Sequence, residues 1–360
     1  MKLVFYISGH GYGHAVRDIE IIKSLLLQSH AEIFFRTQAP KWLFDPLLNE
    51  RVQYHERELD FGVQQKNSFS ADKLGTFQRY ARLVENKDKL IEQECEFLSG
   101  IEPDIVLSDI TPFAFDAADA HGVKAIAVAN FSWDWIYAPY LKECPEYEWI
   151  IEDIKSSYGK AEQLWRIPFY GDMSAFPNRH NVPLVGRRSS KSLSEARARV
   201  GIPRHSKNKY VLLGLRSTDL EQVDWERVES LRHITFVAVS REVPLRNCLH
   251  IREDQLPFVD MLNACDAVLS KPGYSIVSEV ISNRTPIIYV PRQDFVEDPV
   301  LIKGLEEYAV CEELPQSDFY AGQWAEAFDR LFAKPLEWKE IRVDGAEVIA
   351  TKILERNNPH

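Results

Sequence analysis

The sequence predicts an α/β fold made of two doubly wound, Rossmann-like domains that face each other across a cleft. The chain has 360 residues, more than a single hydrophobic core usually fills. Short apolar runs alternate with segments of helical periodicity, which is typical of parallel sheets covered on both faces. This alternation comes in two series, separated by a stretch at 176–192 that is rich in Pro, Asn, Arg and Ser. We therefore expect domains at 1–180 and 181–340, with a C-terminal helix at 341–360 that packs back on the first domain.

Short apolar runs in the first series predict strands at 3–7, 32–36, 52–55, 104–107 and 124–128. Helical periodicity between them predicts helices at 15–28, 71–98 and 113–120. In the second series we expect strands at 210–213, 234–239, 248–251, 267–269 and 286–290. The helices expected there lie at 193–200, 220–231, 257–264, 275–282, 299–307 and 321–332, and a last helical segment covers 335–356.

Composition excludes several classes of protein. A net charge of −11 argues against a general nucleic-acid binder. Apolar residues make up 45% of the chain, but no apolar run reaches the length of a membrane span. The N-terminus leads directly into a strand-like run and shows no apolar h-region or small-residue cleavage site, so we do not expect secretion, and the five cysteines are scattered singly. We expect a cytoplasmic protein with reduced thiols and no metal site.

Ligands of open parallel sheets bind beyond the carboxyl ends of the strands. Six loops there hold most of the unusual residues of the chain: 9–14, 108–111, 130–137, 214–218, 271–275 and 292–298. The first loop reads GHGYGH, with three glycines and two histidines at a strand-to-helix corner. Its spacing is neither the dinucleotide fingerprint nor a P-loop, so it favours chemistry on a hydroxyl group.

The second domain carries the segment SKPGYSIVSE at 270–279, which follows a strand and opens a helix. Gly273 permits a close backbone approach, and a helix N-terminus offers free N–H groups to a diphosphate. Glu279, about one turn further, can accept both hydroxyls of a ribose. The alternative is a surface helix that is capped by Ser275 and has a solvated Glu279.

These motifs resemble those of the GT-B glycosyltransferases, which include the peptidoglycan N-acetylglucosaminyltransferase and the plant and antibiotic sugar transferases. The segments SGHGYGHAVR, LSDITPFAFDAADAHGV, NFSWDWIYAPY, VPLVGRR and GYSIVSE are similar, in this order, to the glycosyltransferase-like N-terminal half of plant-type L-arabinokinases. The similarity runs from about residue 3 to residue 310. The chain ends without the sugar-kinase half of those proteins, so kinase activity is not expected.

The resemblance implies roles for two residues of the first domain. His14 matches the histidine that acts as general base, and a helix N-terminus disfavours its cationic form. Asp109 matches the carboxylate that orients this base. The alternative for His14 is helix capping or a simple structural contact, and the alternative for Asp109 is to cap the helix that follows it.

Two groups of binding residues are expected from these motifs and from the resemblance together. The donor nucleotide sugar is expected at His10, Arg216, Ser217, Gly273, Tyr274, Ser275, Glu279 and Asp294. His10 could instead only fill its loop, and Asp294 could lie in a solvated acidic loop. The acceptor is expected at Gly11, Asn130, Trp133 and Tyr137, where aromatic faces suit sugar rings. The alternative is a packed aromatic loop.

The function expected from the sequence is transfer of a sugar, hexosyl or pentosyl, from a nucleotide diphosphate sugar such as a UDP-sugar to a hydroxyl acceptor. No metal or other cofactor is expected, since GT-B enzymes generally need no bound divalent ion. The partners would be the nucleotide sugar and a small-molecule or glycan acceptor, and a homodimer is left open. Two alternatives stay open: a non-catalytic nucleotide-sugar sensor and a nucleotide-sugar epimerase of the same fold.

Overall fold

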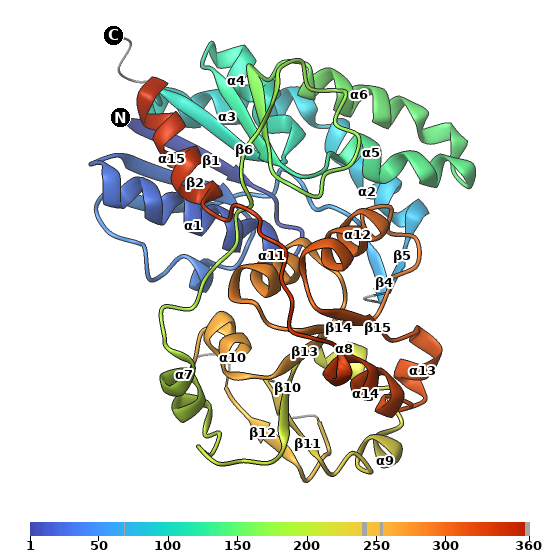
Figure 1. The fold of residues 1–360 in the computed structure, drawn as a ribbon. Helices are drawn as coiled ribbons and strands as arrows, with labels where there is room; N and C mark the ends of the chain where they lie inside the picture. Colours follow the sequence, from blue (N-terminus) through green and yellow to red (C-terminus); the bar gives the residue numbers. More distant parts are fainter. Residues whose placement is uncertain (68, 240–242, 253–254, 357–360) are drawn as a thin grey trace. The chain divides into compact units, whose positions relative to one another are not determined.

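The computed structural model describes residues 1–360 except 68, 240–242, 253–254 and 357–360. It divides into two compact α/β units (Figure 1). Unit 1 consists of Met1–Gln65, Ala71–Val185 and Arg342–His360, and unit 2 consists of Lys66–Ser70 and Gly186–Ile341. Within the described residues, no helix is both long and apolar enough to cross a lipid bilayer.

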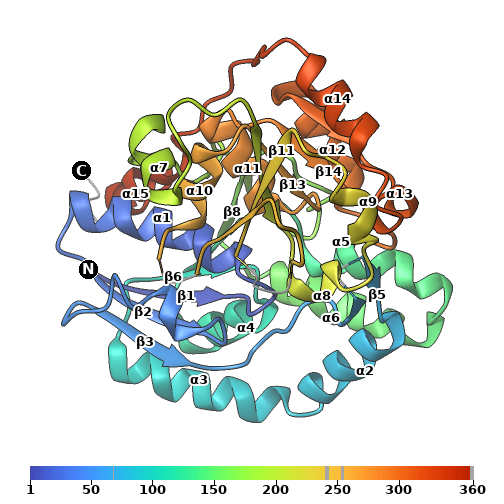
Figure 2. The same ribbon diagram turned by 90° about the horizontal axis from the view of Figure 1, so that it is seen from below.

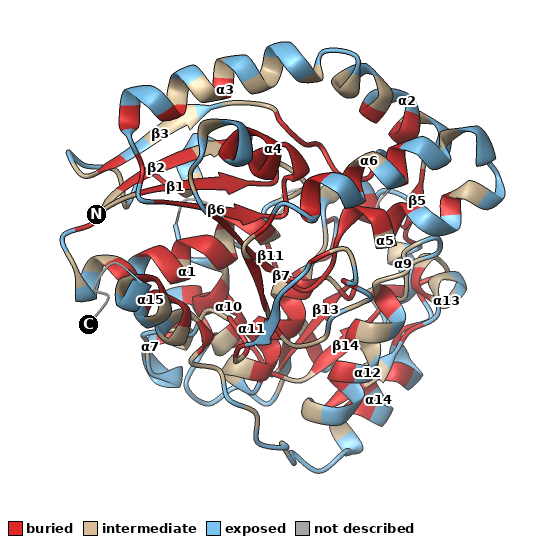
Figure 3. Ribbon diagram, turned by 90° about the horizontal axis from the view of Figure 1, so that it is seen from above, coloured by how far each residue is buried: buried red, intermediate tan, exposed pale blue. Residues whose placement is uncertain are grey.

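Unit 1 is built on a seven-stranded parallel sheet of order β3-β2-β1-β6-β7-β8-β9. Its strands are β1 (Lys2–Ile7), β2 (Glu32–Thr37), β3 (Val52–Glu56), β6 (Ile105–Asp109), β7 (Ala125–Ala129), β8 (Gln163–Arg166) and β9 (Arg179–Asn181). The strands β1, β6 and β7 are apolar and buried along most of their length (Figure 3) because helices cover both faces of the sheet. The sequence did not predict β8 and β9, which are short and partly polar.

Helices cover both faces of this sheet. On one face, α1 (Gly13–Gln28) lies beside α15 (Gly345–Arg356), and on the other lie α3 (Lys87–Ile101) and α4 (Pro112–His121) (Figure 2). The remaining elements of the N-terminal half are α2 (Lys73–Val84), α5 (Trp133–Tyr137), α6 (Glu148–Tyr158), the 3-10 turns Lys41–Leu43, Ala138–Lys142 and Pro145–Tyr147, and the strand pair β4 (Gln65–Asn67) and β5 (Ser70–Ala71).

Unit 2 has a six-stranded parallel sheet of order β12-β11-β10-β13-β14-β15. Its strands are β10 (Lys209–Gly214), β11 (Ile234–Ala238), β12 (Cys248–His250), β13 (Ala267–Ser270), β14 (Ile287–Tyr289) and β15 (Cys311–Glu313). Its helices are α7 (Leu193–Val200), α8 (Ser217–Leu220), α9 (Trp225–Val228), α10 (Phe258–Ala264), α11 (Tyr274–Asn283), α12 (Asp298–Tyr308), α13 (Gln316–Tyr320) and α14 (Ala325–Ala333). The two parallel sheets confirm the predicted fold class.

Three predicted helices were too long. The segment 71–98 forms α2 and α3, because Asn86 starts a new helix and its side chain donates to the Arg82 carbonyl at 3.0 Å. In the segment 220–231, only Leu220, the last residue of α8, and the short helix α9 are helical, because Asp224 caps α9 and its backbone N–H donates to the Tyr320 carbonyl. The last helix, expected at 335–356, begins only at Gly345, and residues 357–360 of the C-terminal segment expected at 341–360 lie outside the described part.

One short piece of the N-terminal half of the chain belongs to unit 2. Phe69 is buried in the core of this unit, and its ring centroid lies 5.9 Å from those of Phe319 and Tyr320. The backbone N–H of Gln293 donates to the Phe69 carbonyl at 3.0 Å. Phe69 therefore ties its part of the chain to unit 2 through its ring and its carbonyl, an attachment that the sequence did not predict.

Replacing Phe69 with alanine removes a buried ring, and such changes cost about 3–5 kcal/mol. We expect Phe69→Ala to lower the unfolding free energy of unit 2 by this order. Hydrogen exchange measured by mass spectrometry should then show faster exchange in β10 and β13. The control is Leu74→Ala, whose side chain is exposed. Protection of β10 and β13 equal to that of the unaltered chain would contradict the assignment.

Candidate active site

The loop that follows β1 brings the start of α1 to the end of β6. Ile7 pairs in register with Asp109, and the backbone N–H of Ser8 donates to the Asp109 carbonyl at 2.7 Å. Gly11 has φ of 69°, a left-handed conformation that favours glycine over other residues. Because parallel strands end at one edge, the first turn of α1 and the last residue of β6 meet there.

His14 and Asp109 form a buried hydrogen-bonded pair at this edge. The Nδ1 of His14 lies 2.9 Å from the Asp109 Oδ1, and the side chains are only 7% and 1% exposed. An ionised carboxylate only accepts, so we assign the proton of the neutral ring to Nδ1. Among the described residues Nε2 has no hydrogen-bond partner. The pair therefore presents an unprotonated Nε2, the atom that a general base needs.

Arg17 completes the group, and the sequence analysis missed it. Its Nε donates to the Asp109 Oδ2 at 2.9 Å, its Nη2 donates to the same carboxylate, and its Nη1 donates to the Asn130 side-chain oxygen at 3.1 Å. Burial alone would raise the pKa of Asp109, but Arg17 and His14 outweigh it and hold this pKa below its usual value. The sequence could have indicated Arg17, because a residue three positions after His14 in a helix lies on the same face as His14.

A second buried carboxylate, Asp60, ties the surrounding loops together. Its side chain accepts from Ser8 Oγ at 2.6 Å and from the Trp133 indole at 2.9 Å. Burial raises its pKa, although both hydrogen bonds act in the opposite direction. The sequence analysis did not select Asp60, because a single aspartate in a loop carries no distinguishing spacing.

The predicted acceptor residues Asn130, Trp133 and Tyr137 are buried. Asn130 holds Arg17, and the rings of Trp133 and Tyr137 stack at 5.5 Å. The Tyr137 hydroxyl donates to the Gly62 carbonyl. This differs from the open aromatic faces expected from the sequence, because these side chains serve the packed aromatic loop that was the alternative. Of the acceptor set, Gly11 is partly exposed.

His10 packs over Gly62. A side chain at Gly62 would come within 2.3 Å of the His10 ring, and the φ of Gly62 is 63°. The His10 ring also lies 5.5 Å from that of Trp133 in an edge-to-face arrangement. The structure thus gives His10 a packing role in unit 1, and its contact with a donor stays a prediction.

In unit 2 the predicted donor residues lie at the carboxyl ends of three neighbouring strands. Gly214, Ser270 and Tyr289 are aligned in the sheet, and Ser270 Oγ donates to the Gly214 carbonyl at 2.7 Å. The loops that follow carry Arg216, which is exposed, and Ser217, which is partly exposed. These loops therefore share one edge of the sheet.

These loops carry three cationic side chains, those of Arg216, Lys271 and Arg292. Lys271 has a weaker ion pair than Arg292. Burial lowers the pKa of Lys271 to about 8, against the attraction of Asp219, whose Oδ2 is 4.0 Å from its Nζ. Arg292 instead donates to Asp298 from Nε at 2.8 Å and to the Pro272 carbonyl at 3.1 Å. Arg292 thereby fixes the loop before α11, and Lys271 remains the cation best suited to meet an anion.

Helix α11 begins at the predicted position. Gly273 is its N-cap, no side chain caps it, and a methyl group at Gly273 would meet nothing within 4 Å. Because Gly273 is the cap, Ser275 lies within the first turn of the helix and is not the cap that the alternative required. Tyr274 is buried and Ser275 is partly exposed. Asp294 is exposed in the following loop. The start of α11 is therefore open to a ligand, as a phosphate site requires.

Glu279 is the residue expected at a ribose, and that contact stays a prediction. It is 2% exposed, and its Oε1 accepts from Arg187 Nε at 2.6 Å. The side-chain amide of Asn283, in the same helix, donates a hydrogen bond to the Arg187 carbonyl at 2.9 Å. These contacts fix the segment that leads into unit 2, so the structure gives Glu279 an anchoring role.

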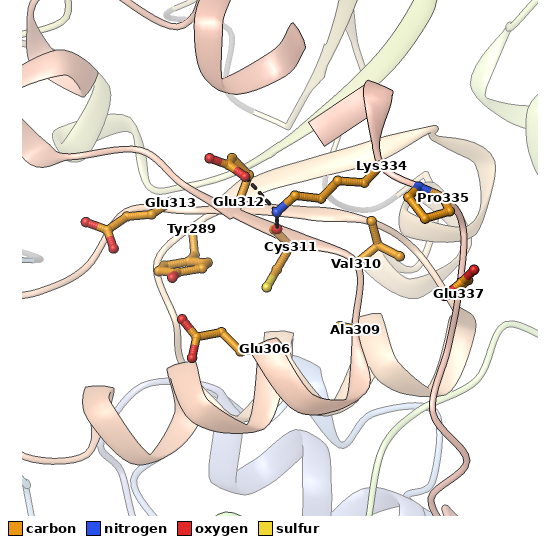
Figure 4. Close-up of a pocket in the computed structure, with 10 residues that line it drawn as sticks. All are labelled: Tyr289, Glu306, Ala309, Val310, Cys311, Glu312, Glu313, Lys334, Pro335 and Glu337. Carbon is orange, nitrogen blue, oxygen red and sulfur yellow. Dashed lines mark hydrogen bonds and ion pairs between the residues drawn. The ribbon is translucent and has the colours of Figure 1, made fainter. Parts of the chain in front are cut away.

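A cavity of about 500 Å³ in unit 2 includes Tyr289 of β14 in its lining. It is lined by β14, β15 and the ends of α12 and α14, with Glu306, Glu312 and Glu313 among its side chains (Figure 4). Lys334 is held there by Glu312 at 2.7 Å. The acidic lining would repel a diphosphate, and none of the predicted site residues contributes to it. We therefore place the candidate site at the strand ends.

The fold defined by these two units is that of the GT-B glycosyltransferases. The kitacinnamycin glycotransferase superposes with a TM-score of 0.66 at 13% identity, covering 99% of both chains. The spinosyn forosaminyltransferase has a TM-score of 0.63 at 14% identity, covering 100% of this chain and 96% of its own. A UDP-glucosyltransferase from Polygonum tinctorium gives 0.60 at 15% identity, covering 98% and 92%.

Sequence similarity adds a particular relative. An L-arabinokinase of Arabidopsis thaliana is 32% identical over 99% of this chain, and the chain spans 34% of the length of that protein. No protein-family model matches the chain. The resemblance to L-arabinokinase and to GT-B glycosyltransferases, drawn from the motifs, is thereby confirmed.

Asp18 is a further buried carboxyl group beside the site, one helical turn beyond His14. Within the described part of the chain its Oδ2 has no hydrogen-bond partner. Burial raises the pKa of Asp18 well above its usual value, and the nearby Asp109 raises it further. The pKa of Asp18 is thus raised while the pKa of Asp109 is lowered, so of the two carboxyl groups Asp109 is the one whose ionised form is favoured.

A raised pKa in the folded state destabilises the fold as pH rises above the pKa of the unfolded chain. We expect Asp18→Asn to increase the unfolding free energy at neutral pH and to have little effect below about pH 4. Urea denaturation over a pH series measures this difference, with the exposed Asp88→Asn as the control. An Asn variant that is equally stable or less stable at neutral pH would contradict the raised pKa of Asp18.

Proposed function

We propose that the chain is a glycosyltransferase that moves a sugar from a nucleotide diphosphate sugar, such as a UDP-sugar, to a hydroxyl acceptor. The observation that carries this proposal is the His14–Asp109 pair, with its free Nε2, on a GT-B fold. Two structural neighbours support the choice of donor, since one is a UDP-glucosyltransferase and the other is complexed with UDP-2-fluoro-glucose.

His14 would act on the acceptor. Its Nε2 takes the proton of the acceptor hydroxyl while the hydroxyl oxygen forms a bond to the anomeric carbon of the donor. The bond from this carbon to the diphosphate oxygen breaks, and the nucleoside diphosphate leaves with that electron pair. Asp109 stabilises the positive charge that develops on the ring. Arg17 keeps Asp109 ionised, so this stabilisation is available throughout the reaction.

The residues of unit 2 would bind the donor. Lys271, Arg216 and the uncapped start of α11 offer positive charge and N–H groups to the diphosphate. These groups would also stabilise the leaving diphosphate as its negative charge grows. No step requires a metal ion, and metal independence stays part of the proposal.

The role of His14 can be tested by separating binding from transfer. We expect His14→Gln to slow transfer about 10²- to 10⁴-fold, the usual contribution of a general base. The thermal shift caused by the donor should stay unchanged. UDP release from UDP-glucose, with naphthol or methyl glucoside as acceptor, measures the transfer. The exposed His180→Gln, also in unit 1, is the matched control.

Other outcomes favour the alternatives. A donor-induced thermal shift without any transfer or hydrolysis in the unaltered protein would favour a nucleotide-sugar sensor. Conversion of UDP-N-acetylglucosamine without an acceptor would favour an epimerase. Transfer by His14→Gln at the rate of the unaltered protein would contradict the base assignment.

The pKa of about 8 for Lys271 predicts a pH dependence of donor binding. The side chain is cationic below this pH and attracts phosphate, and it loses that charge above it. We expect the dissociation constant of UDP to rise up to about 10-fold between pH 7 and pH 9, as for one charge-assisted contact. Calorimetry should show this rise in the unaltered protein and in the exposed Lys207→Met. A rise that persists in Lys271→Met would exclude Lys271 as its source.

A further inference from the structure

Two exposed aromatic side chains lie together in unit 1. Tyr12 is 49% exposed and Trp42 is 48% exposed, and their ring centroids are 5.6 Å apart at an interplanar angle of 82°. Large aromatic side chains usually bury most of their surface in a core or an interface. A pair that leaves about half of each side chain in solvent therefore offers ring faces to a ligand.

The pair lies beside the candidate base. Tyr12 belongs to the loop after β1, two residues before His14, and Trp42 belongs to the turn Lys41–Leu43 after β2. The strands are neighbours, with Ile7 aligned to Thr37, so both loops leave the sheet at one edge. The two loops approach each other closely at Gly9 and Gln38, because a Cβ atom added at Gly9 would lie 3.3 Å from the Cβ atom of Gln38. The sequence analysis did not select Tyr12 or Trp42.

The arrangement of the rings indicates the kind of ligand. Rings at nearly a right angle form a corner in which a third ring can stack on one and turn its edge to the other. Neither aromatic side chain carries a charge in its ordinary state, and the nearby Lys41 is neutralised by Asp45 at 2.6 Å. The surface therefore suits an uncharged ring with an apolar face.

We propose that Tyr12 and Trp42 bind the ring of the acceptor, an arene or a pyranose whose own hydroxyl receives the sugar. This inference rests on the proposed function, since it names the acceptor class for the same site. The aromatic surface expected at Trp133 and Tyr137 is thus supplied by other residues. Those two rings are buried beneath the loops, while Tyr12 and Trp42 meet solvent at the edge that carries His14.

Binding without donor tests the proposal, since it needs no transfer. Saturation-transfer NMR with naphthol and with methyl glucoside, in separate samples, gives a dissociation constant for each ring type. An aromatic contact contributes about 0.5–1.5 kcal/mol, so Trp42→Ala and Tyr12→Ala should each weaken binding about 2- to 13-fold. Trp42→Phe should recover most of the affinity. Trp149→Ala is the matched control, since Trp149 is 45% exposed on α6 of the same unit.

The outcome decides between two ring types and separates this proposal from the function. Tighter binding of naphthol assigns an arene acceptor, and tighter binding of methyl glucoside assigns a sugar. Equal binding by Trp42→Ala and the unaltered protein, or no binding of either ring, would overturn the proposal. His14→Gln should bind the ring normally, so a failure of the base assignment leaves ring binding intact.

Discussion

The buried carboxylate of Asp109 is the constraint on which the candidate site depends. It lies at the end of β6 with almost no access to water, so its charge requires partners within the protein. Arg17 supplies a full positive charge and His14 a hydrogen-bond donor, and both come from the first two turns of α1. Because Arg17 already pairs with the carboxylate, the buried charge of Asp109 does not need a second cation.

The surrounding architecture holds this group in one geometry. Asn130, at the end of β7, fixes Arg17, while Asp60 joins the loop after β1 to the Trp133 indole. Trp133 and Tyr137 pack beneath, so water has little access to the pair from that side. In unit 2, the Arg292–Asp298 ion pair fixes the loop before α11. Lys271 in this loop has only a long ion pair with Asp219. In the proposed function, unit 1 would supply the base and unit 2 the positive charge.

The sequence predicted most of the sheets, since buried parallel strands such as 3–7 and 267–269 are apolar runs that stand out. It missed β8 and β9, which are short and polar, and it merged α2 with α3 because the break at Asn86 leaves the periodicity intact. His14, Asp109 and Gly273 could be selected because each follows a recognisable strand. Arg17, Asp60 and the Tyr12–Trp42 pair could not, since their roles depend on contacts between distant segments or on exposure.

The central claim is that Asp109 fixes the tautomer of His14 so that Nε2 is the free base. The NMR chemical shifts of the two ring nitrogens, recorded at alkaline pH where the ring is neutral, report this directly. The account predicts a protonated Nδ1 and an unprotonated Nε2, with a mixture of tautomers in Asp109→Asn. A ring of the unaltered protein that carries its proton on Nε2 would contradict the account, because no lone pair would then be available to the acceptor.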